Sequence, residues 1–344
     1  MTLLSEITGR PSQREIYDER FRSDEYDSRS KVRVLTVEFD ALKAAVARAT
    51  SSIPEGPVSL FDFGCGTGRV TNEFVDWYLT EGAAVGRDLH VFAYDVSSVG
   101  LARAAQRLQT THGFRMTGES SWQEEADETY VAASLERVGP RARSRVVLIH
   151  ATETGSAEHM RDFVVHQNGG ARVLLTTSWY SGLGHIPGRS HRHAFVSAFG
   201  EMTDPRGEVL LAVSSTGDLV EAQEYWDGVR EQGGPHPSIL ADTGDVMYET
   251  ELGQQNYWHL FGDDLLDHLR GITGEGQRCW IEGVRVPGDE FTCVDEEQAN
   301  FRAVQALNRK LAGTTWQDED YRSFHTILAV RSGSPAGVDT TLAG

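Results

Sequence analysis

Short apolar runs alternate along this chain with longer segments in which apolar residues recur at helical spacing. Five such runs precede residue 214, at 58–63, 90–94, 145–150, 171–177 and 208–213. Between them, apolar positions three and four residues apart predict amphipathic helices, at about 69–79, 99–108, 160–166 and 189–202. Strands that alternate with helices in this way are typical of a parallel sheet with helices on both faces.

The flanking segments are less regular. Residues 34–49 predict a further amphipathic helix, and 10–33 predict one or two short helices. The polar stretch at 120–138 is predicted to be mostly helical. Beyond residue 214, the pattern predicts strands at 279–286 and 324–330, a hairpin or an extended loop at 246–257, and helices at 221–231, 260–269 and 296–311.

The first apolar run ends in a glycine-rich turn, and the second ends on a carboxylate. Gly64, Gly66 and Gly68 follow Asp62 closely, and the second run ends at Asp95. Glycine lets the backbone turn sharply and admits a ligand close to the main chain. A carboxylate can accept two hydroxyl donors at once. The pair therefore predicts a site for an adenosine-containing ligand at the carboxyl ends of the strands.

The spacing of the glycines narrows the choice of cofactor. No glycine stands where G-x-G-x-x-G needs its third one to pack a dinucleotide against the helix, and no G-K-[ST] appears. The run FDFGCGTG at 61–68 resembles the first motif of the class I S-adenosylmethionine-dependent methyltransferases, including Cys65 after its first glycine. The resemblance spans roughly residues 58–213. It implies an α/β fold with a doubly wound, Rossmann-like, seven-stranded and mostly parallel sheet, and S-adenosyl-L-methionine as the cofactor.

The resemblance also implies roles for single residues. The glycine turn would cradle the methionine part of the cofactor, with Asp62 near its amino group, and Asp95 would accept the ribose hydroxyls. After the third run, Thr152 or Glu153 stands where the family contacts adenine, although the family more often has Asp there. The cofactor contacts implied in this way are Asp62, Gly64, Cys65, Gly66, Gly68, Asp95, Val96, Thr152 and Ser178.

The fourth run leads into Ser178, Trp179 and Tyr180, where the family places residues near the sulfonium and the acceptor. Many small-molecule and amine methyltransferases have Asp or Asn-Pro-Pro-Tyr here, and this chain has neither. Because the face of an aromatic ring attracts a cation, Tyr180 or Trp179 is a candidate contact of the sulfonium. The alternative is that both rings pack against the following helix.

A histidine-containing segment follows at 183–187, and in the superfamily such a segment usually supports the core. His185 is therefore either a catalytic base or a core residue. His191 and His193 stand nearby, but no carboxylate completes a ligand set, so no metal is expected.

Aromatic residues gather in an insertion after the fifth run and at the N-terminus. In the superfamily these regions form a lid over the acceptor, so Tyr17, Tyr26 and Tyr257 are candidate substrate contacts, and Trp179 after the fourth run is a further candidate. The alternative is a surface insertion with its own small aromatic cluster. We expect an N-terminal helical lid at 1–52, a cofactor domain at 53–332 with a substrate insertion at about 215–275, and a disordered tail at 333–344.

Composition restricts the class of partner. The formal net charge of −19 over 344 residues disfavours a nucleic acid partner. The three cysteines are too few for a disulfide framework, which suits a reducing compartment. No run approaches the roughly 20 apolar residues of a membrane span, and residues 1–10 lack the features of a signal peptide. We expect a cytoplasmic protein that binds neither nucleic acid nor membrane, and a homodimer stays open.

Two reactions fit these features. The first is methyl transfer to a small-molecule acceptor in specialised metabolism, which needs alignment of the nucleophile and exclusion of water. The alternative is transfer of the aminocarboxypropyl arm of the same cofactor, or its cyclisation to azetidine-2-carboxylate, with release of methylthioadenosine. The intact glycine turn and Asp95 disfavour a third reading as a non-catalytic cofactor-binding subunit.

Overall fold

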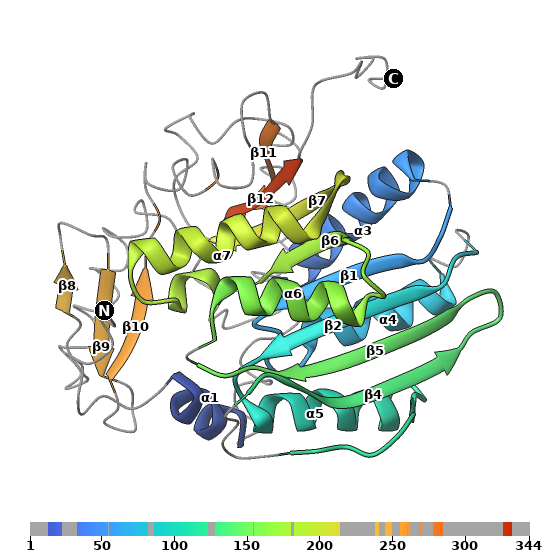
Figure 1. The fold of residues 1–344 in the computed structure, drawn as a ribbon, viewed down its shortest axis with the longest axis horizontal. Coiled ribbons are helices and arrows are strands. Elements are labelled where there is room, and N and C mark those ends of the chain that lie inside the picture. The colour runs from blue at the N-terminus through green and yellow to red at the C-terminus, as the bar shows by residue number, and fades with distance from the viewer. Residues whose placement is uncertain are drawn as a thin grey trace, which may run out of the picture.

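The computed structural model describes most of the chain up to residue 213 and short segments beyond it. The described residues are 13–22, 33–53, 55–81, 86–122, 128–153, 155–179, 182–213, 238–240, 245–249, 255–259, 261, 269, 278–284 and 326–331. Among these, nine strands form a central sheet in the order β11-β12-β7-β6-β1-β2-β5-β4-β3 (Figure 1). The strands are β1 Val58–Phe63, β2 Leu89–Asp95, β3 Arg115–Met116, β4 Tyr130–Val138, β5 Arg143–His150, β6 Val173–Ser178, β7 Thr203–Val213, β11 Arg278–Val284 and β12 Thr326–Arg331.

The centre of the sheet is parallel, as the sequence predicts. Strands β7, β6, β1, β2 and β5 pair in parallel with one another, whereas β12 and β11 beyond β7, and β4 and β3 beyond β5, are joined by antiparallel pairing. From β1, the parallel strands β2 and β5 follow on one side, and the chain then crosses to β6 on the other side of β1. Such a reversal of strand order leaves a crevice at the carboxyl ends of the two central strands. The predicted strands at 279–286 and 324–330 are confirmed as β11 and β12.

The edge beyond β5 corrects two predictions. The sheet has nine strands rather than seven, and the stretch at 120–138, predicted to be mostly helical, ends in the nine-residue strand β4. Ala, Leu, Glu and Arg in this stretch favour a helix by intrinsic propensity. Pairing with β5, which would otherwise be an open edge, outweighs that preference.

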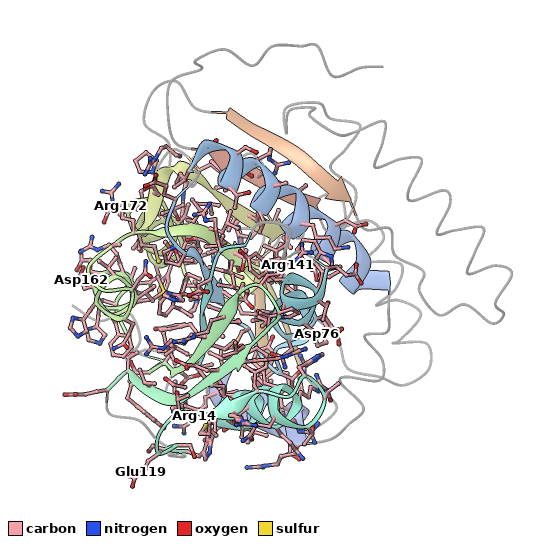
Figure 2. All side chains as sticks on the ribbon, turned by 90° about the vertical axis from the view of Figure 1, so that its right-hand side faces the viewer. Arg14, Asp76, Glu119, Arg141, Asp162 and Arg172 are labelled. Carbon is pink, nitrogen blue, oxygen red and sulfur yellow. The ribbon has the colours of Figure 1, made fainter. Side chains whose placement is uncertain are left out.

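Helices cover both faces of the sheet, which confirms the doubly wound arrangement (Figure 1). One face carries α3 Arg33–Ser52, α4 Arg69–Thr80 and α5 Ser98–Thr110, and its core cluster includes Leu42, Phe74 and Leu101. The other carries α6 Ala157–Gln167 and α7 Arg189–Met202, packed around aromatic residues of β1 and α7. Figure 2 shows the side chains filling the space between these layers, with charged groups such as Asp162 and Arg172 projecting outward.

Helix α3 crosses one face from the carboxyl to the amino edge of the sheet. Its C-terminus leads within a few residues into the start of β1. There the Arg87 guanidinium donates hydrogen bonds to the carbonyls of Gly56, at 2.6 Å, and Glu55, at 2.8 Å. Arg48 on the same helix binds the fully buried carboxylate of Glu208 at 2.7 Å. The N-terminal half of α3 therefore lies toward the carboxyl ends of the strands.

Three elements lie beyond the carboxyl ends of the parallel strands. They are α1 Gln13–Arg22, the 3-10 helix η3 Gly182–His185, and a small antiparallel sheet of β8 Ser238–Leu240, β9 Asp245–Glu249 and β10 Gln255–His259 (Figure 1). Strand β10 packs beside η3. Pairing of β9 with β10 confirms the hairpin alternative for 246–257.

Other predictions fall outside the described residues. These are the helices at 221–231 and 296–311, nearly all of the helix at 260–269, and the tail at 333–344. Among the helices that the structure describes, none combines the length and the apolar character needed to cross a membrane.

Candidate functional site

The glycine turn after β1 is built from left-handed backbone. Gly64, Gly66 and Gly68 have φ angles of 68°, 54° and 72°, a region that side chains with a Cβ rarely adopt. The amide nitrogens of Gly64 and Cys65 both donate to the carbonyl of Tyr94, at 2.8 and 3.1 Å. These bonds join the turn to the end of β2. Gly64 itself is exposed, so the turn presents open backbone at the edge of the sheet.

Asp95 binds the glycine turn directly. Its carboxylate accepts the Gly66 amide at 2.7 Å and the Ser97 amide at 2.8 Å. Burial raises the pKa of Asp95 to about 6, although both amide bonds oppose the shift. Each carboxylate oxygen keeps a further lone pair for another donor. Asp95 thus shapes the turn and can still accept hydroxyl groups from a ligand.

Asp62 lies beneath the turn, inside β1. It accepts hydrogen bonds from the hydroxyls of Thr71, on α4, and Thr177, on β6, the latter at 2.9 Å. Its pKa is raised to about 7, chiefly by complete burial and further by the nearby charges of Glu38 and Asp95. Glu38 belongs to α3 and is only 3% exposed. Sequence reasoning missed it, because nothing local marks one acidic residue of an amphipathic helix as buried.

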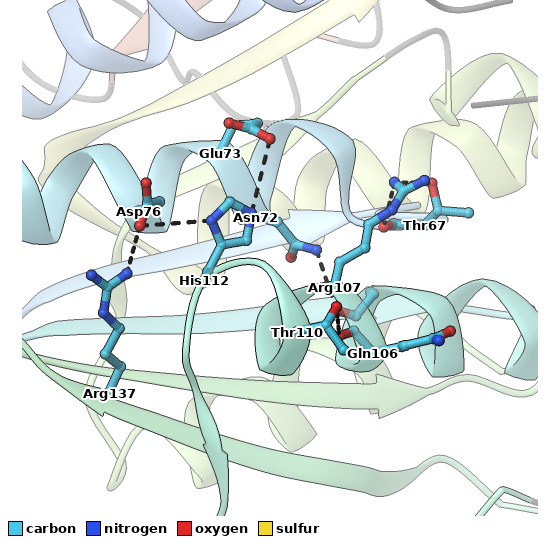
Figure 3. A network of polar contacts seen from close by, with 10 residues as sticks. Thr67, Asn72, Glu73, Asp76, Gln106, Arg107, Thr110, His112 and Arg137 are labelled. Carbon is cyan, nitrogen blue, oxygen red and sulfur yellow. Dashed lines mark hydrogen bonds and ion pairs between the residues drawn. The ribbon is translucent and has the colours of Figure 1, made fainter. Parts of the chain in front are cut away.

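A polar network secures the helices behind the turn (Figure 3). Arg107 on α5 donates to the Thr67 hydroxyl at 3.3 Å, and the Asn72 amide donates to the Ala104 carbonyl at 3.2 Å. His112 lies 3.6 Å from Asp76, which also binds Arg137 on β4. These contacts hold α4 and α5 together, so the turn between β1 and α4 rests on a fixed support.

Helix α1 lies over the glycine turn. The ring of Phe21 is so close that a Cβ on Gly66 would lie 3.0 Å from it, and one on Gly100 would lie 2.8 Å away. The Asp18 carboxylate accepts a hydrogen bond from the Ser97 hydroxyl, at the start of α5. Ser97 in turn caps that helix by accepting the Gly100 amide at 2.9 Å. The contacts join α1 to both the turn and α5.

Two further contacts extend α1 across the site. The Tyr17 hydroxyl and the His185 Nε2 atom are 2.9 Å apart, and their rings meet edge to face at 5.5 Å. The Arg14 amide donates to the Glu153 carboxylate at 2.7 Å. Sequence reasoning placed Tyr17 and His185 in the site separately, and the structure brings them into one pair. Through these contacts α1 reaches the loops after β1, β2, β5 and β6.

The loop after β5 is fixed by a histidine. His150 Nε2 lies 2.9 Å from the Val96 carbonyl, which can only accept, so this nitrogen carries the proton. Nδ1 then accepts from the Tyr130 hydroxyl at 3.0 Å. Burial lowers the pKa of His150, which favours this neutral form. Thr152 lies two residues on, in a turn where its carbonyl accepts the Gly155 amide at 3.2 Å. The only sequence signal for His150 is a polar residue at the end of an apolar run.

The last residue of β6 carries a buried polar atom. The Ser178 side chain is fully buried, and its hydroxyl has no hydrogen-bond partner among the described residues. A Cβ on Gly182 would lie 3.1 Å from that hydroxyl and 3.5 Å from the Phe63 carbonyl. Gly182 and Gly64 face each other across this gap, where a Cβ on Gly64 would lie 3.8 Å from the Gly182 Cα. Sequence reasoning missed Gly182, since a single glycine in a loop carries no local signal.

Trp179 lies on the opposite side from Ser178. It is 5% exposed and packs in the core cluster of α3 and α4, and its indole nitrogen has no partner within the described part of the chain.

Tyr26 and Tyr180 lie outside the described residues. Tyr257 belongs to β10, which packs beside η3, and its side chain is not described. His191 binds the Pro187 carbonyl at 3.1 Å. The described residues contain no group of three or more possible metal ligands.

Comparison with known proteins yields structural likeness only. No protein-family model matches the chain, and no curated protein matches it. A solved S-adenosylmethionine-dependent methyltransferase from Clostridium acetobutylicum shares 10% identity at a TM-score of 0.46, over 93% of this chain and all of that one. An amino pentose methyltransferase from Micromonospora echinaspora shares 14% at 0.39, over 90% of this chain and 95% of that one.

The plantazolicin methyltransferase, solved with S-adenosylhomocysteine, shares 13% identity at a TM-score of 0.42, over 92% of this chain and 94% of that one. All three scores lie below 0.5. We therefore base the function on the residues of this chain.

Proposed function

We propose that this chain is an S-adenosylmethionine-dependent methyltransferase that acts on a small-molecule acceptor. One observation supports this above the others: the buried Asp95 carboxylate, at the end of β2, is hydrogen-bonded to the Gly66 amide of the glycine turn. The contact supports the proposal, because a carboxylate suited to ribose hydroxyls then lies beside the glycine turn at the switch point of the sheet.

The donor and acceptor groups fit this cofactor. The lone pairs left on Asp95 suit the ribose hydroxyls, and exposed Gly64 leaves room for a chain that runs over the turn. Val96 and Thr152, joined through the His150 loop, flank the place proposed for adenine. Cys65 and Ser178 complete the proposed set. When bound, the cofactor supplies a methyl group on a positively charged sulfur.

We assign proton handling to the pair of Tyr17 and His185. Their 2.9 Å contact lies between α1 and η3, next to β10 of the insertion. A neutral imidazole can take the proton of a hydroxyl acceptor, and the Tyr17 hydroxyl orients that ring. A neutral amine acceptor needs no base, so the pair would then only position the acceptor.

Helix α1 is proposed as a lid. Its contacts with the loops after β1, β2, β5 and β6 close the carboxyl end of the sheet in this conformation. Closure of that kind excludes water and fixes the alignment of nucleophile and methyl group. The lid has to open for the cofactor to enter, because Asp95 is only 7% exposed beneath it.

Product analysis tests the proposal. The purified protein is incubated with S-adenosylmethionine, with and without a panel of small amines and alcohols, and the products are separated by mass spectrometry. We expect S-adenosylhomocysteine only when an acceptor is present. Methylthioadenosine formed without an acceptor would instead support the aminocarboxypropyl alternative. Failure to bind S-adenosylhomocysteine in calorimetry would reject the cofactor itself.

A further inference from the structure

A chain of hydrogen bonds runs from strand β4 to Asp95 through side chains that have no part in the reaction proposed above. The Tyr130 hydroxyl, at the start of β4, binds Nδ1 of His150 at 3.0 Å. His150 is 1% exposed, and its Nε2 atom binds the Val96 carbonyl at 2.9 Å. The next amide, that of Ser97, donates to the Asp95 carboxylate at 2.8 Å. An imidazole bound at both nitrogens has one fixed orientation.

The Val96 carbonyl and the Ser97 amide belong to one peptide unit. Because a peptide unit is planar, a bond that fixes the direction of its carbonyl also fixes the direction of its N–H. His150 therefore acts on Asp95 through this peptide. The Ser97 amide binds Oδ1 of Asp95, and the Gly66 amide binds Oδ2 at 2.7 Å. One carboxylate oxygen is thus held by the glycine turn and the other by the peptide that His150 fixes.

A β-bulge in β4 brings Tyr130 to the same face of the sheet as His150. The two residues lie opposite each other in the pairing of β4 with β5, and the register shifts between Val131 and Ala133. Ala132 and Ala133 both belong to the core cluster on the α4 and α5 face, whereas Val131 packs on the other face. Unbroken alternation would place Tyr130 on the face opposite to Ala133, so the bulge makes the contact with His150 possible.

The polar pair is demanding compared with its neighbours in the same two strands. The next pair, Val131 and Ile149, is apolar and needs no hydrogen bonds from its side chains. A buried imidazole, by contrast, destabilises the fold unless its nitrogens have partners. The Tyr130 hydroxyl meets part of this need by donating to Nδ1, which keeps the proton of the neutral ring on Nε2, the atom that faces the Val96 carbonyl.

We propose that His150 and Tyr130 are positioning residues that orient the Asp95 carboxylate for the ribose hydroxyls of the cofactor. The inference rests on the proposed function, in which Asp95 binds those hydroxyls. Tyr130 keeps the His150 proton on Nε2, and His150 holds the peptide that binds Asp95. Because each hydrogen bond in such a chain polarises the next, loss of either side chain weakens the hold on the carboxylate. The two residues thereby favour ligands that carry a vicinal diol.

The preference of the protein for a ligand with ribose hydroxyls tests the inference. Calorimetry with the full-length protein compares S-adenosylhomocysteine with an analogue that lacks both hydroxyls. The ratio of the two dissociation constants isolates the hydroxyl contacts, since the rest of the ligand is the same. For two charge-assisted hydrogen bonds we expect a ratio of about 100 in the unaltered protein. His150→Leu removes the bond to the Val96 carbonyl and should lower the ratio about tenfold.

Conservative variants separate positioning from packing. His150→Gln keeps a donor near the place of Nε2, so its ratio should stay within about threefold of that of the unaltered protein. Tyr130→Phe keeps the ring and loses the hydroxyl, which should lower the ratio about threefold. Two controls should leave it unchanged: Tyr78→Phe, which loses a bond to the Arg87 carbonyl, and His90→Gln, in the amino half of β2.

Nitrogen NMR of the protein with labelled histidine gives a readout that does not depend on ligand affinity. The spectrum distinguishes a proton on Nε2 from one on Nδ1, and the signal of His150 is the one that is missing in His150→Gln. We expect the proton on Nε2, with and without S-adenosylhomocysteine. A proton on Nδ1 would overturn the inference, because Nε2 could then not donate to the Val96 carbonyl.

The outcomes separate this inference from the proposed function. If His150→Leu and Tyr130→Phe weaken both ligands equally, the ratio is unchanged, the two residues are only structural, and the methyltransferase proposal stands. If His150→Leu does not fold, Tyr130→Phe and its control decide by the same ratio. If the unaltered protein binds both ligands equally, Asp95 does not bind the hydroxyls, and the inference falls with that assignment. If it binds neither ligand, the proposed function fails, and the inference with it.

Discussion

The turn after β1 and the end of β6, which meet at the centre of the sheet, differ in how their polar groups are hydrogen-bonded. In the turn after β1, the amides of Gly64, Cys65 and Gly66 all donate to acceptors of the chain itself. At the end of β6, the Ser178 hydroxyl and the Trp179 indole nitrogen are buried without a partner among the described residues. The β1 turn therefore has its amides bonded within the chain, whereas among the described residues the end of β6 has buried polar atoms without a partner.

This difference indicates how each of the two segments contributes to ligand binding. A loop whose hydrogen bonds are already made is preorganised, so a ligand pays little to order it. A loop with unused buried donors gains stability when a ligand supplies acceptors. We infer that the turn after β1 is a preorganised binding surface for the cofactor. The buried polar groups at the end of β6 would gain hydrogen bonds only when a ligand binds.

The most severe change to the fixed side is Asp95→Asn. The substitution removes the charge that holds the Gly66 and Ser97 amides and that suits ribose hydroxyls. We expect the dissociation constant of S-adenosylhomocysteine to rise by about 100-fold, as expected for two charge-assisted hydrogen bonds. Calorimetry measures it, with exposed Asp162→Asn as the matched control. An affinity within about threefold of the unaltered protein would refute the role of Asp95.

The buried carboxylates near the β1 turn should also make the free energy of unfolding depend on pH. The pKa of Asp62 is raised from 3.8 to about 7 in the folded chain, so the unfolded chain loses this proton first as pH rises. The ligand-free protein therefore loses stability between about pH 4 and pH 7, with little further change from this group above pH 7. Asp95 acts with the same sign.

Asp62→Asn should flatten that dependence. At about 1.4 kcal/mol for each pKa unit, we expect the variant to recover about 2 kcal/mol at pH 8 relative to pH 5, after allowance for relaxation at the buried site. Urea unfolding at several pH values measures the free energy. A variant with the same slope as the unaltered protein would show that Asp62 does not titrate in this range.

On the β6 side, Gly182→Ala tests the importance of the space between Gly182 and the turn after β1. The added Cβ would lie 3.1 Å from the Ser178 hydroxyl and narrow the space between the two loops. We expect turnover of the acceptor to fall about tenfold, because steric narrowing by one methyl costs about that much. The same substitution combined with Ser178→Ala should regain part of the loss, which identifies that contact as the cause.

The smallest effect is expected for Tyr17→Phe. The ring stays against Phe21, and only the hydroxyl bound to His185 is lost. We expect kcat for a hydroxyl acceptor to fall about fivefold, with a shift in its pH profile and unchanged cofactor affinity. Tyr78→Phe, which loses a bond to the Arg87 carbonyl at the amino edge, is the control. It should lower stability and leave the pH profile unchanged.

Much of the scaffold is predictable from local pattern. The run at 58–63 becomes β1 with its predicted bounds, and the helix at 189–202 becomes α7 with its predicted bounds. Apolar runs and helical spacing are properties of short windows, so the sequence shows them directly. The prediction of a helix over most of 120–138 was wrong, because residues there favour a helix by propensity and pairing of β4 with β5 outweighs that preference.

The amino acid sequence by itself determined the glycine turn, Asp62 and Asp95, because left-handed backbone and a carboxylate at a strand end are local requirements. Only the tertiary structure brought Tyr17 to His185, 168 residues away, and placed Glu38 beside Asp62. Those contacts depend on where α1 and α3 pack on the sheet. A charged residue on a helix becomes a buried one with a changed environment only when packing removes it from water.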